Sequence, residues 1–231
     1  MTKHLPLLFA LLGGILLGAA GTYLFKGQIV RSAILENPEM IPEAIELLNK
    51  KESQKRLATV DDKLSQPYSG AVAGNPNGDV TVVKFTDYNC GYCRASLAHV
   101  DQLIGSDKGV KIVYREMPIL AESSKTAALW ALAAAKQNKY SAFHKAMFDG
   151  GRVSDASIQS AAQSVGLDMA AAQAVVASQE AVSELQSNVG MMQQLGFNGT
   201  PTFIIGDQIM EGLQDYEILQ AAVDKAREAK G

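Results

Sequence analysis

The feature of this sequence that most restricts its fold is the segment N-C-G-Y-C-R at residues 89 to 94, which holds both cysteines of the 231-residue chain. Cys90 ends the β-branched run VTVVKFTDYNC, and a helical pattern follows from Cys93 to Ile104. A second strand pattern, VKIVYREM, comes next. Strand, helix and strand at this spacing predict a βαβ unit with a parallel sheet, and they place the cysteine pair where the first strand meets the helix.

Several kinds of site can contain two cysteines at this spacing. Structural zinc usually takes four ligands, but the chain has no further cysteine, and His99 and His144 lack paired spacing. Covalent haem attachment needs a histidine where the chain has Arg94. A purely structural disulfide would close too small a loop to stabilise the fold much. A redox centre agrees best with the surrounding sequence.

The redox interpretation follows from the position of the pair. The sulfur of Cys90 is expected at a helix N-terminus, where unpaired N–H groups and the helix dipole stabilise a thiolate. We therefore expect Cys90 to be an exposed, acidic thiol with a pKa in the range of about 3.5 to 7.5. Cys93 lies one turn further, where it is expected to be buried and able to resolve a mixed disulfide.

The chain begins with a basic and then an apolar segment. Lys3 and His4 precede the run LPLLFALLGGILLGAAGTYLF, from Leu5 to Phe25. This pattern predicts a secretory signal peptide cleaved near Ala20. The alternative is an uncleaved membrane anchor over residues 5 to 25, because about 20 apolar residues span a bilayer. Both alternatives place the rest of the chain in an oxidising compartment.

Residues 26 to 66 predict two short amphipathic helices. Apolar residues recur at helical spacing until Asn37-Pro38 interrupts them, and Ile41, Ile45 and Leu48 then form a second apolar stripe. These stripes must pack against the main domain or against another copy of the chain. The segment PYSGAVAGNPNGD that follows indicates a linker and a turn. The formal net charge of −3 argues against a nucleic-acid partner.

The remaining residues complete an α/β pattern. From Ser123 to Leu195 the periodicity is helical, with Ser123-Ser124, Ser154, Asp168 and Gly196 among the expected caps and stops. Two short strand patterns, TFIIG and QIMEG, follow, and a helix from about Asp215 to Ala229 ends the chain. The predicted order is βαβ, a helical insertion, and ββα.

Three motifs, V-V-K-F-T-D-Y-N-C-G-Y-C-R, Y-R-E-M-P-I-L and G-T-P-T-F-I-I-G, resemble the DsbA-like thioredoxin-fold oxidoreductases over roughly residues 68 to 231. The segment I-L-E-N-P-E-M-I-P-E-A-I-E-L-L resembles the N-terminal domain of the ScsC branch (suppressor of copper sensitivity protein C) and related Com1-like proteins. The resemblance implies an α/β thioredoxin fold at residues 67 to 231, with an all-helical insertion at about 120 to 195. A short N-terminal helical segment at 26 to 66 precedes it.

The resemblance also assigns the site. It implies Cys90 and Cys93 as the catalytic pair, with Gly91 and Tyr92 tuning the redox couple; this pair lacks the histidine of the strongest oxidants, so a milder couple is expected. It further implies a cis peptide bond between Thr200 and Pro201, although a trans proline opening a strand is the ordinary state. The backbone of Thr200 would then pair with an extended substrate peptide.

Lys84 departs from the family pattern. The family commonly has a buried glutamate six positions before the first cysteine, where it exchanges a proton with the second cysteine. A buried Lys84 would instead favour a thiolate and would prefer a partner such as Glu116. The alternative is that Lys84 points outward and has no role.

Three functions remain open at this level. The first is a disulfide isomerase or reductase, the second a disulfide oxidase, and the third a Cu(I)-binding protein that uses both thiolates. The resemblance favours the isomerase, because its N-terminal helices oligomerise and because threonine precedes the proline. It implies cysteine-containing secreted substrates, a membrane redox partner, a periplasmic location, a homo-oligomer formed through residues 26 to 66, and neither a cofactor nor a resident metal.

Overall fold

The computed structural model describes residues 26–28, 30–60 and 62–229. Contacts divide the chain into two compact units, with the boundary between Asn49 and Lys50. In the first unit a helical stretch over residues 30 to 36 ends at Asn37, whose side-chain amide donates a 3.0 Å hydrogen bond to the carbonyl of Ala33. Helix α2 (Met40–Leu57) begins after Pro38, so the two helices expected here are confirmed.

The second unit is built on one sheet of five strands in the order β1-β3-β2-β4-β5. The central strands β2 (Val80–Thr86) and β3 (Val110–Glu116) are parallel, which confirms the βαβ prediction. Strands β4 (Thr202–Ile205) and β5 (Gln208–Glu211) pair in antiparallel fashion with β2 and with each other. The sheet and its helices confirm the expected α/β thioredoxin fold.

Strand β1 (Val72–Gly74) was not expected, because its residues lie in the segment interpreted as linker and turn. It pairs antiparallel with β3, with Val72 opposite Val113. A three-residue strand that contains alanine and glycine has little β propensity of its own, so only the pairing with β3 creates it.

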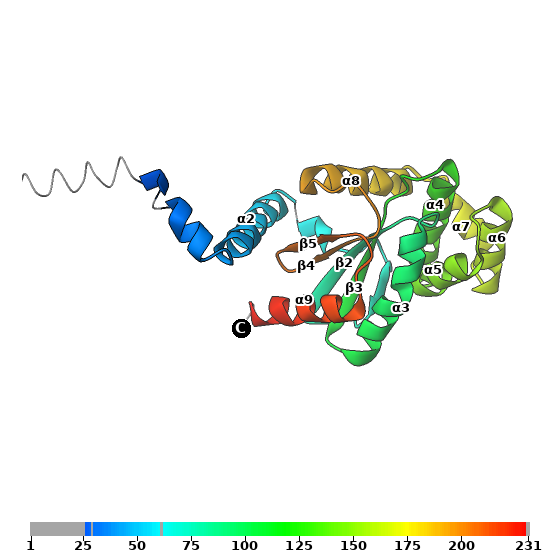
Figure 1. The fold of residues 1–231 in the computed structure, drawn as a ribbon. Coiled ribbons are helices and arrows are strands. Elements are labelled where there is room, and N and C mark those ends of the chain that lie inside the picture. Colours follow the sequence, from blue (N-terminus) through cyan, green and yellow to red (C-terminus); the bar gives the residue numbers. More distant parts are fainter. Residues whose placement is uncertain (1–25, 29, 61, 230–231) are drawn as a thin grey trace, which may run out of the picture. The chain divides into compact units, whose positions relative to one another are not determined.

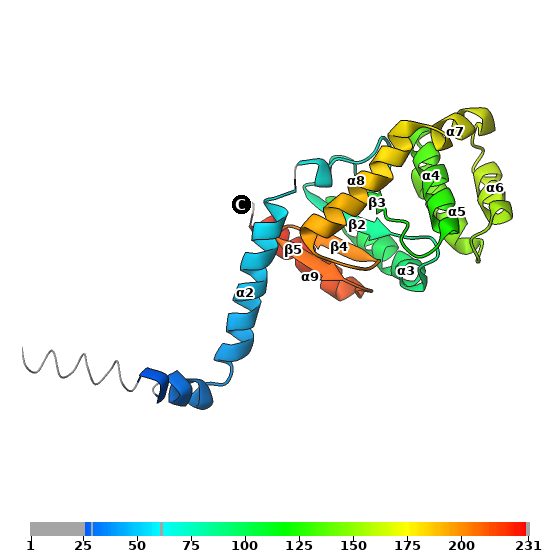
Figure 2. The ribbon, with the colours of Figure 1, turned by 90° about the horizontal axis from the view of Figure 1, so that it is seen from above.

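Helix α3 (Gly91–Ser106) joins β2 to β3, and α9 (Tyr216–Glu228) ends the described chain. The all-helical insertion lies between β3 and β4, as expected. It consists of α4 (Glu122–Lys136), α5 (Tyr140–Asp149), α6 (Asp155–Ser164), α7 (Met169–Val176) and α8 (Gln179–Leu195). Helices α4 to α7 gather at one end of the sheet, whereas α8 and α9 lie on its opposite faces (Figures 1 and 2).

The helix caps explain most of the breaks within the insertion. Ser154 and Asp168 cap the N-termini of α6 and α7, and Gly196 ends α8 in the left-handed conformation, with φ of 72°. The expected cap at Ser123-Ser124 is wrong. The N-cap of α4 is Ala121, and the Ser124 hydroxyl instead donates a hydrogen bond to Asp87.

Residues 50 to 66 were expected to belong to the oligomerisation region, but contacts assign the chain from Lys50 on to the second unit. Leu57, Val60 and Leu64 lie against the core on the α8 face of the sheet. Buried Arg115 fixes this segment, since its guanidinium donates to the carbonyl of Leu64 (3.2 Å) and forms a 2.8 Å ion pair with Glu184. The apolar residues near the end of α2 therefore have a partner within their own chain.

Candidate active site

Cys90 is the N-cap residue of α3, at the point where β2 has ended. Its sulfur accepts a hydrogen bond from the backbone N–H of Cys93 (3.2 Å) and lies 3.1 Å from the carbonyl oxygen of Thr200. A hydrogen bond from the Cys93 thiol, with further bonds from the N–H groups of Cys93 and Tyr92, lowers the pKa of Cys90 to about 5 although burial opposes ionisation. The expected acidic thiol is thus present.

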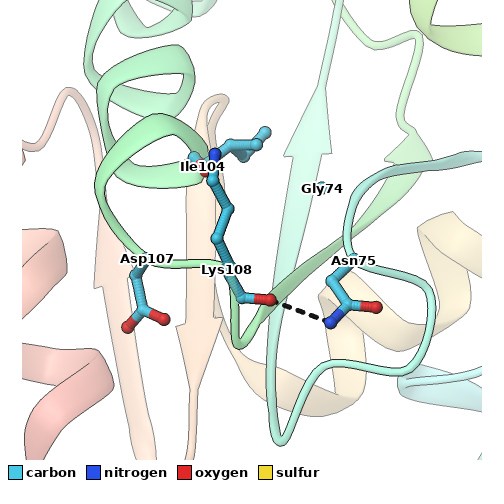
Figure 3. A pocket seen from close by; sticks show the side chains of 5 residues that line it. All are labelled: Gly74, Asn75, Ile104, Asp107 and Lys108. Atoms are coloured by element: carbon cyan, nitrogen blue, oxygen red, sulfur yellow. Dashed lines mark hydrogen bonds between the residues drawn. The ribbon is translucent and has the colours of Figure 1, made fainter.

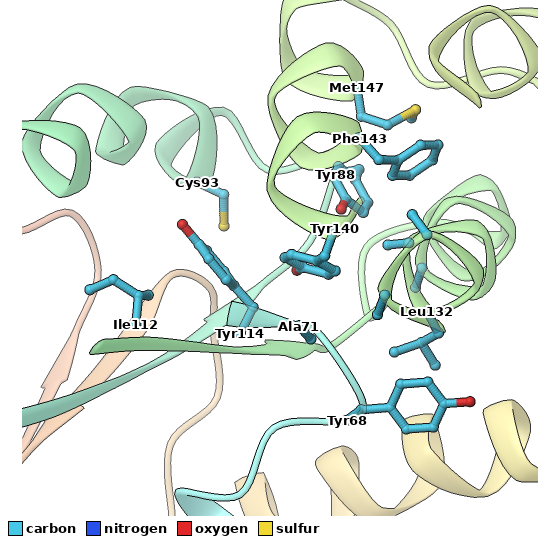
Figure 4. Close-up of a cluster of buried hydrophobic side chains, with 14 of the residues drawn as sticks. Tyr68, Ala71, Tyr88, Cys93, Ile112, Tyr114, Leu132, Tyr140, Phe143 and Met147 are labelled. Carbon is cyan, nitrogen blue, oxygen red and sulfur yellow. The ribbon is translucent and has the colours of Figure 1, made fainter. Parts of the chain in front are cut away.

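The expectation that Cys90 is exposed is wrong. It is only 7% exposed, because the chain at Thr200 covers the sulfur. Cys93 is completely buried, and desolvation raises the pKa of its thiol well above the ordinary value. Its sulfur points into the core toward Tyr114 (Figure 4). Both cysteines are free thiols.

We expect alkylation of the reduced protein to depend on pH through Cys90 alone. Because the pKa of Cys90 is about 5, its labelling rate should be nearly constant above pH 6 and should fall about tenfold per pH unit well below 5. Both cysteines lie in one tryptic peptide, between Lys84 and Arg94, so fragment ions in tandem mass spectrometry must locate the label. Labelling of Cys93 before Cys90 at pH 5 to 6 would reverse the assignment.

The loop at residues 199 to 202 lies directly beside Cys90. The peptide bond between Thr200 and Pro201 is cis, as expected. Two hydrogen bonds hold the loop: the Thr202 hydroxyl donates to the carbonyl of Gly199 (2.8 Å), and the N–H of Gly212 donates to the carbonyl of Pro201 (2.8 Å). The cysteine pair and this loop, 110 residues apart in sequence, therefore form one site.

The two residues between the cysteines face outward. Gly91 is exposed, with open space where a Cβ would lie, and the side chain of Tyr92 is 66% exposed. Neither residue therefore changes the relative stability of dithiol and disulfide through a buried side chain. Any tuning by this pair must act through the backbone N–H groups around the Cys90 sulfur and through contacts with a bound substrate.

Lys84 is completely buried, so the alternative of an outward-pointing, idle lysine is wrong. Its ammonium nitrogen lies 5.7 Å from the ring centre of Tyr114 and 5.8 Å from that of Phe203, and it has no hydrogen-bond partner among the described residues. Burial lowers the pKa of Lys84 to about 8, and the charges of Cys93 and Cys90 oppose this shift. A positive Lys84 would thus favour the thiolate of either cysteine.

Glu116 does not form the expected direct bond with Lys84. Its carboxyl instead accepts hydrogen bonds from the hydroxyls of Tyr140 (2.5 Å) and Tyr88 (3.1 Å), and Tyr88 also lies 3.0 Å from Nδ1 of His144. Burial raises the pKa of Glu116 to about 8. The core therefore holds a lysine whose pKa is lowered by burial and a carboxyl whose pKa is raised by it. The bonds of Glu116 to Tyr88 and Tyr140 are the part that the sequence did not indicate.

Replacing Lys84 with methionine should stabilise the oxidised protein near neutral pH. In the reduced structure the folded pKa of about 8 lies below the ordinary value of 10.5, so the cost of burying this charge is complete below pH 8 and disappears as pH rises to 10.5. A disulfide removes the thiolates of Cys93 and Cys90, which oppose this shift, so the cost in the oxidised protein is no smaller. Lys84→Met should raise the free energy of unfolding by up to about 3 kcal/mol at pH 7 and by little above pH 10.5.

Urea unfolding of the oxidised protein at the two pH values measures this difference without interference from the thiols. The matched control is Lys111→Met, which removes a partly exposed lysine on the same sheet. If Lys84→Met raised the free energy of unfolding equally at both pH values, Lys84 would not be buried in its charged form. The same substitution should slow the release of mixed disulfides, because the Cys93 thiolate loses a nearby cation.

Other parts of the catalytic unit offer little for this chemistry. A surface pocket of about 430 Å³ is lined by Gly74, Asn75, Ile104, Asp107 and Lys108 at the far end of α3 (Figure 3). It includes neither cysteine nor the loop at Thr200. In the described ranges no group of three or more His, Cys, Asp or Glu side chains could hold a metal ion, and no helix there is long and apolar enough to cross a bilayer. The apolar segment at residues 5 to 25 lies outside those ranges.

A strand that delivers an acidic cysteine to a helix N-terminus, with a second cysteine buried one turn on, defines the class of thioredoxin-fold thiol:disulfide oxidoreductases. Residues 81–224 match the DSBA-like thioredoxin domain, and residues 27–55 match the N-terminal domain of the copper resistance protein ScsC. The chain belongs to the DSBA-like thioredoxin domain family.

Solved structures agree with this assignment. A thioredoxin-like oxidoreductase from Silicibacter pomeroyi is 43% identical, with a TM-score of 0.70 over 73% of this chain and 98% of that one. The thiol-disulfide exchange protein alpha-DsbA2 from Wolbachia pipientis is 30% identical, with a TM-score of 0.71 over 76% and 96%. A linker-deletion variant of Proteus mirabilis ScsC is 28% identical, with a TM-score of 0.70 over 87% and 92%.

Curated relatives include much longer proteins. Two Na⁺/H⁺ antiporters NhaA, from Salinispora tropica and Salinispora arenicola, are 27% and 26% identical over 67% of this chain. The chain spans about a quarter of the length of these relatives, 24% in each case.

Proposed function

We propose that this chain is an exported thiol:disulfide oxidoreductase that acts on cysteine-containing secreted proteins, chiefly as a disulfide isomerase or reductase. The observation that supports the exchange activity itself, whatever its direction, is the opposite pKa shift of the two thiols. Cys90 has a pKa of about 5 and is a thiolate at neutral pH, whereas burial keeps Cys93 protonated until it is needed. The Cys90 sulfur can therefore attack a substrate disulfide while the Cys93 thiol remains protonated.

The exchange proceeds in two displacements. The Cys90 thiolate attacks one sulfur of a substrate disulfide; the S–S bond breaks, and the other substrate sulfur leaves as a thiolate. Cys93 then gives its proton to the substrate thiolate released in the first step and attacks the Cys90 sulfur, which forms the Cys90–Cys93 disulfide and releases the second substrate sulfur as a thiolate. Two electrons pass to the substrate, so a further partner must reduce the enzyme before the next reductive cycle. In isomerisation a substrate thiol resolves the mixed disulfide instead, and no net electron transfer occurs.

The N-terminal helices support the isomerase over the oxidase. Among the described residues, seven large apolar side chains between positions 30 and 48 are exposed: Val30, Leu35, Met40, Ile41, Ile45, Leu47 and Leu48. Exposed apolar surface at this density indicates an interface. We propose that sibling chains associate through it, so that several cysteine pairs act on one misfolded substrate.

An oxidase remains the second candidate because of Cys90 itself. A cysteine with a pKa near 5 stabilises the reduced enzyme and is a good leaving group, and both properties favour donation of a disulfide. The two functions also imply different membrane partners: a reductase that keeps the isomerase reduced, or an oxidase that recharges the disulfide.

We propose a periplasmic location, reached through residues 1 to 25, either as a cleaved signal or as an inner-membrane anchor over residues 5 to 25. The similarity to a periplasmic thioredoxin-like protein of Salmonella enterica serovar Typhimurium supports this location. Cu(I) binding by the two thiols is the least supported function, because two ligands from one chain make a poor site for the ion.

The redox state in cells tests the direction of the reaction. Cells are quenched in acid and alkylated with a reagent that adds mass to each thiol, and the protein is then separated on a non-reducing gel. We expect most of the protein to carry two labels, because an isomerase needs a reduced Cys90. A mostly unlabelled, oxidised pair would overturn the isomerase proposal in favour of the oxidase.

A further inference from the structure

Asp87 is a buried carboxylate for which the exchange chemistry has no direct use. It follows β2 immediately and is 1% exposed. Both oxygens are saturated with hydrogen bonds from backbone and hydroxyl groups. The sequence motifs did not single out Asp87, although aspartate often forms an Asx turn by accepting a hydrogen bond from the N–H two residues on. Here that bond comes from the N–H of Asn89 (2.8 Å).

The two carboxylate oxygens bond to different segments. Oδ1 accepts from the N–H of Asn89 and from the hydroxyl of Ser124 (2.7 Å), which ties the turn before Cys90 to the first turn of α4. Oδ2 accepts from the N–H groups of Ile119 (2.9 Å) and Leu120 (3.0 Å). Asp87 therefore links the loop that carries the thiol to the loop between β3 and α4.

Further bonds brace the same junction. The side-chain amide of Asn89 donates to the hydroxyl of Ser124 (2.8 Å), which itself donates to Asp87, so three side chains form a short chain of hydrogen bonds. The backbone carbonyl of Asp87 accepts from the N–H of Cys90 (3.1 Å). The turn that positions the sulfur is thus part of the same network.

The loop held by Oδ2 presents apolar side chains to solvent. Ile119 is 38% and Leu120 is 54% exposed, and exposed Tyr92 lies between the cysteines. Such side chains contribute to binding only if their backbone is already ordered, because ordering a loop during binding weakens affinity. Two bonds from a saturated, buried carboxylate provide that order.

We propose that Asp87 is a positioning residue, which holds Ile119 and Leu120 at a fixed place beside the turn that precedes Cys90. There they would bind apolar side chains next to the cysteine of an extended polypeptide. This deepens the proposed function by naming the substrate class, and it rests on the exchange activity but not on its direction. The carboxylate is required because it accepts four hydrogen bonds, whereas an asparagine amide has one accepting oxygen and an NH₂ group that donates.

The test compares two disulfides as substrates of the full-length reduced protein. One is a synthetic decapeptide disulfide with leucines flanking the cysteine, and the other is hydroxyethyl disulfide, which is too small to reach the loop. Asp87→Asn should lower kcat/KM for the peptide about tenfold, mainly by raising KM, because small misplacements of binding groups are costly. The rate with hydroxyethyl disulfide should fall by less than about threefold.

A double-mutant cycle then asks whether Asp87 acts through the loop. Ile119→Ser/Leu120→Ser removes the apolar side chains and keeps the backbone bonds. Combining it with Asp87→Asn should cost no more than the more harmful of the two changes alone, since both remove the same interaction. Asp149→Asn, at an exposed carboxylate paired with Lys145, is the matched control and should leave both rates unchanged.

Ser124→Ala keeps the proposal testable if Asp87→Asn fails to fold. It removes one of the four bonds to Asp87 and the bond that Ser124 accepts from the Asn89 amide. It should lower kcat/KM for the peptide about threefold and leave the rate with hydroxyethyl disulfide less affected. Equal losses for both substrates, or additive losses in the cycle, would show that Asp87 only supports the fold. The assay measures reduction alone, so an oxidised pair in cells would overturn the isomerase proposal and leave this result standing.

Discussion

Cys90→Ser should abolish disulfide exchange with every substrate, down to the rate in buffer alone. The serine hydroxyl ionises far less readily than a thiol whose pKa is about 5, and it cannot form a mixed disulfide. Reduction of insulin, followed by turbidity with a thiol such as dithiothreitol as the electron source, measures this loss. Far-ultraviolet circular dichroism should remain unchanged, because one sulfur becomes one oxygen at the helix cap.

Cys93→Ser is the informative partner of this change. The attacking thiolate remains, but no second thiol can resolve the intermediate, so mixed disulfides with substrate should accumulate on non-reducing gels. Most of the acidity should remain, because a serine hydroxyl can still donate the hydrogen bond that is the largest cause of the lowered pKa of Cys90. If Cys90→Ser formed stable mixed disulfides with substrate, or if Cys93→Ser formed none, the roles assigned to the two cysteines would have to be reversed.

Removing residues 26 to 49 should separate assembly from chemistry. The chain beginning at Lys50 should be monomeric, whereas the chain beginning at Lys26 should form a small symmetric oligomer in sedimentation at micromolar concentration. Hydroxyethyl disulfide should be reduced at a rate within about twofold per active site, since the cysteine pair is untouched. Recovery of scrambled ribonuclease should fall at least about tenfold, because the effective concentration of neighbouring thiols is lost.

The position of this cut matters. A deletion through residue 66 would also remove Leu57, Val60 and Leu64, which cover the α8 face of the sheet, and it would expose core residues such as Phe85. The matched control is one full-length variant in which the three residues of the apolar stripe are replaced together: Ile41→Ser, Ile45→Ser and Leu48→Ser. Two results would contradict the role of these helices in assembly and isomerisation. One is a monomeric state of the chain that begins at Lys26, and the other is full ribonuclease recovery by the chain that begins at Lys50.

The sequence by itself determined the features that depend on neighbouring residues. The β-branched runs formed β2 and β3, and the helical pattern after Cys90 formed α3. The cap at Ser154 began α6 and Gly196 ended α8, where expected. These features are local: alternation, helical period and capping act within a few residues. The direction of the Cys90 pKa shift was predictable for the same reason, because its largest cause, the hydrogen bond from the Cys93 thiol, comes from the same helix turn, as do the smaller contributions of the N–H groups of Cys93 and Tyr92.

Only the tertiary structure decided which polar groups are buried together. The sequence left open whether Lys84 is buried or exposed, and its place in the central strand buries it near the rings of Tyr114 and Phe203. Glu116 is bonded to Tyr88 and Tyr140, and the carboxylate of Asp87 reaches Ser124, 37 residues along the chain. Such partners come from strand register and from helices returning over the sheet, and a buried polar group costs too much unless those distant segments supply its bonds.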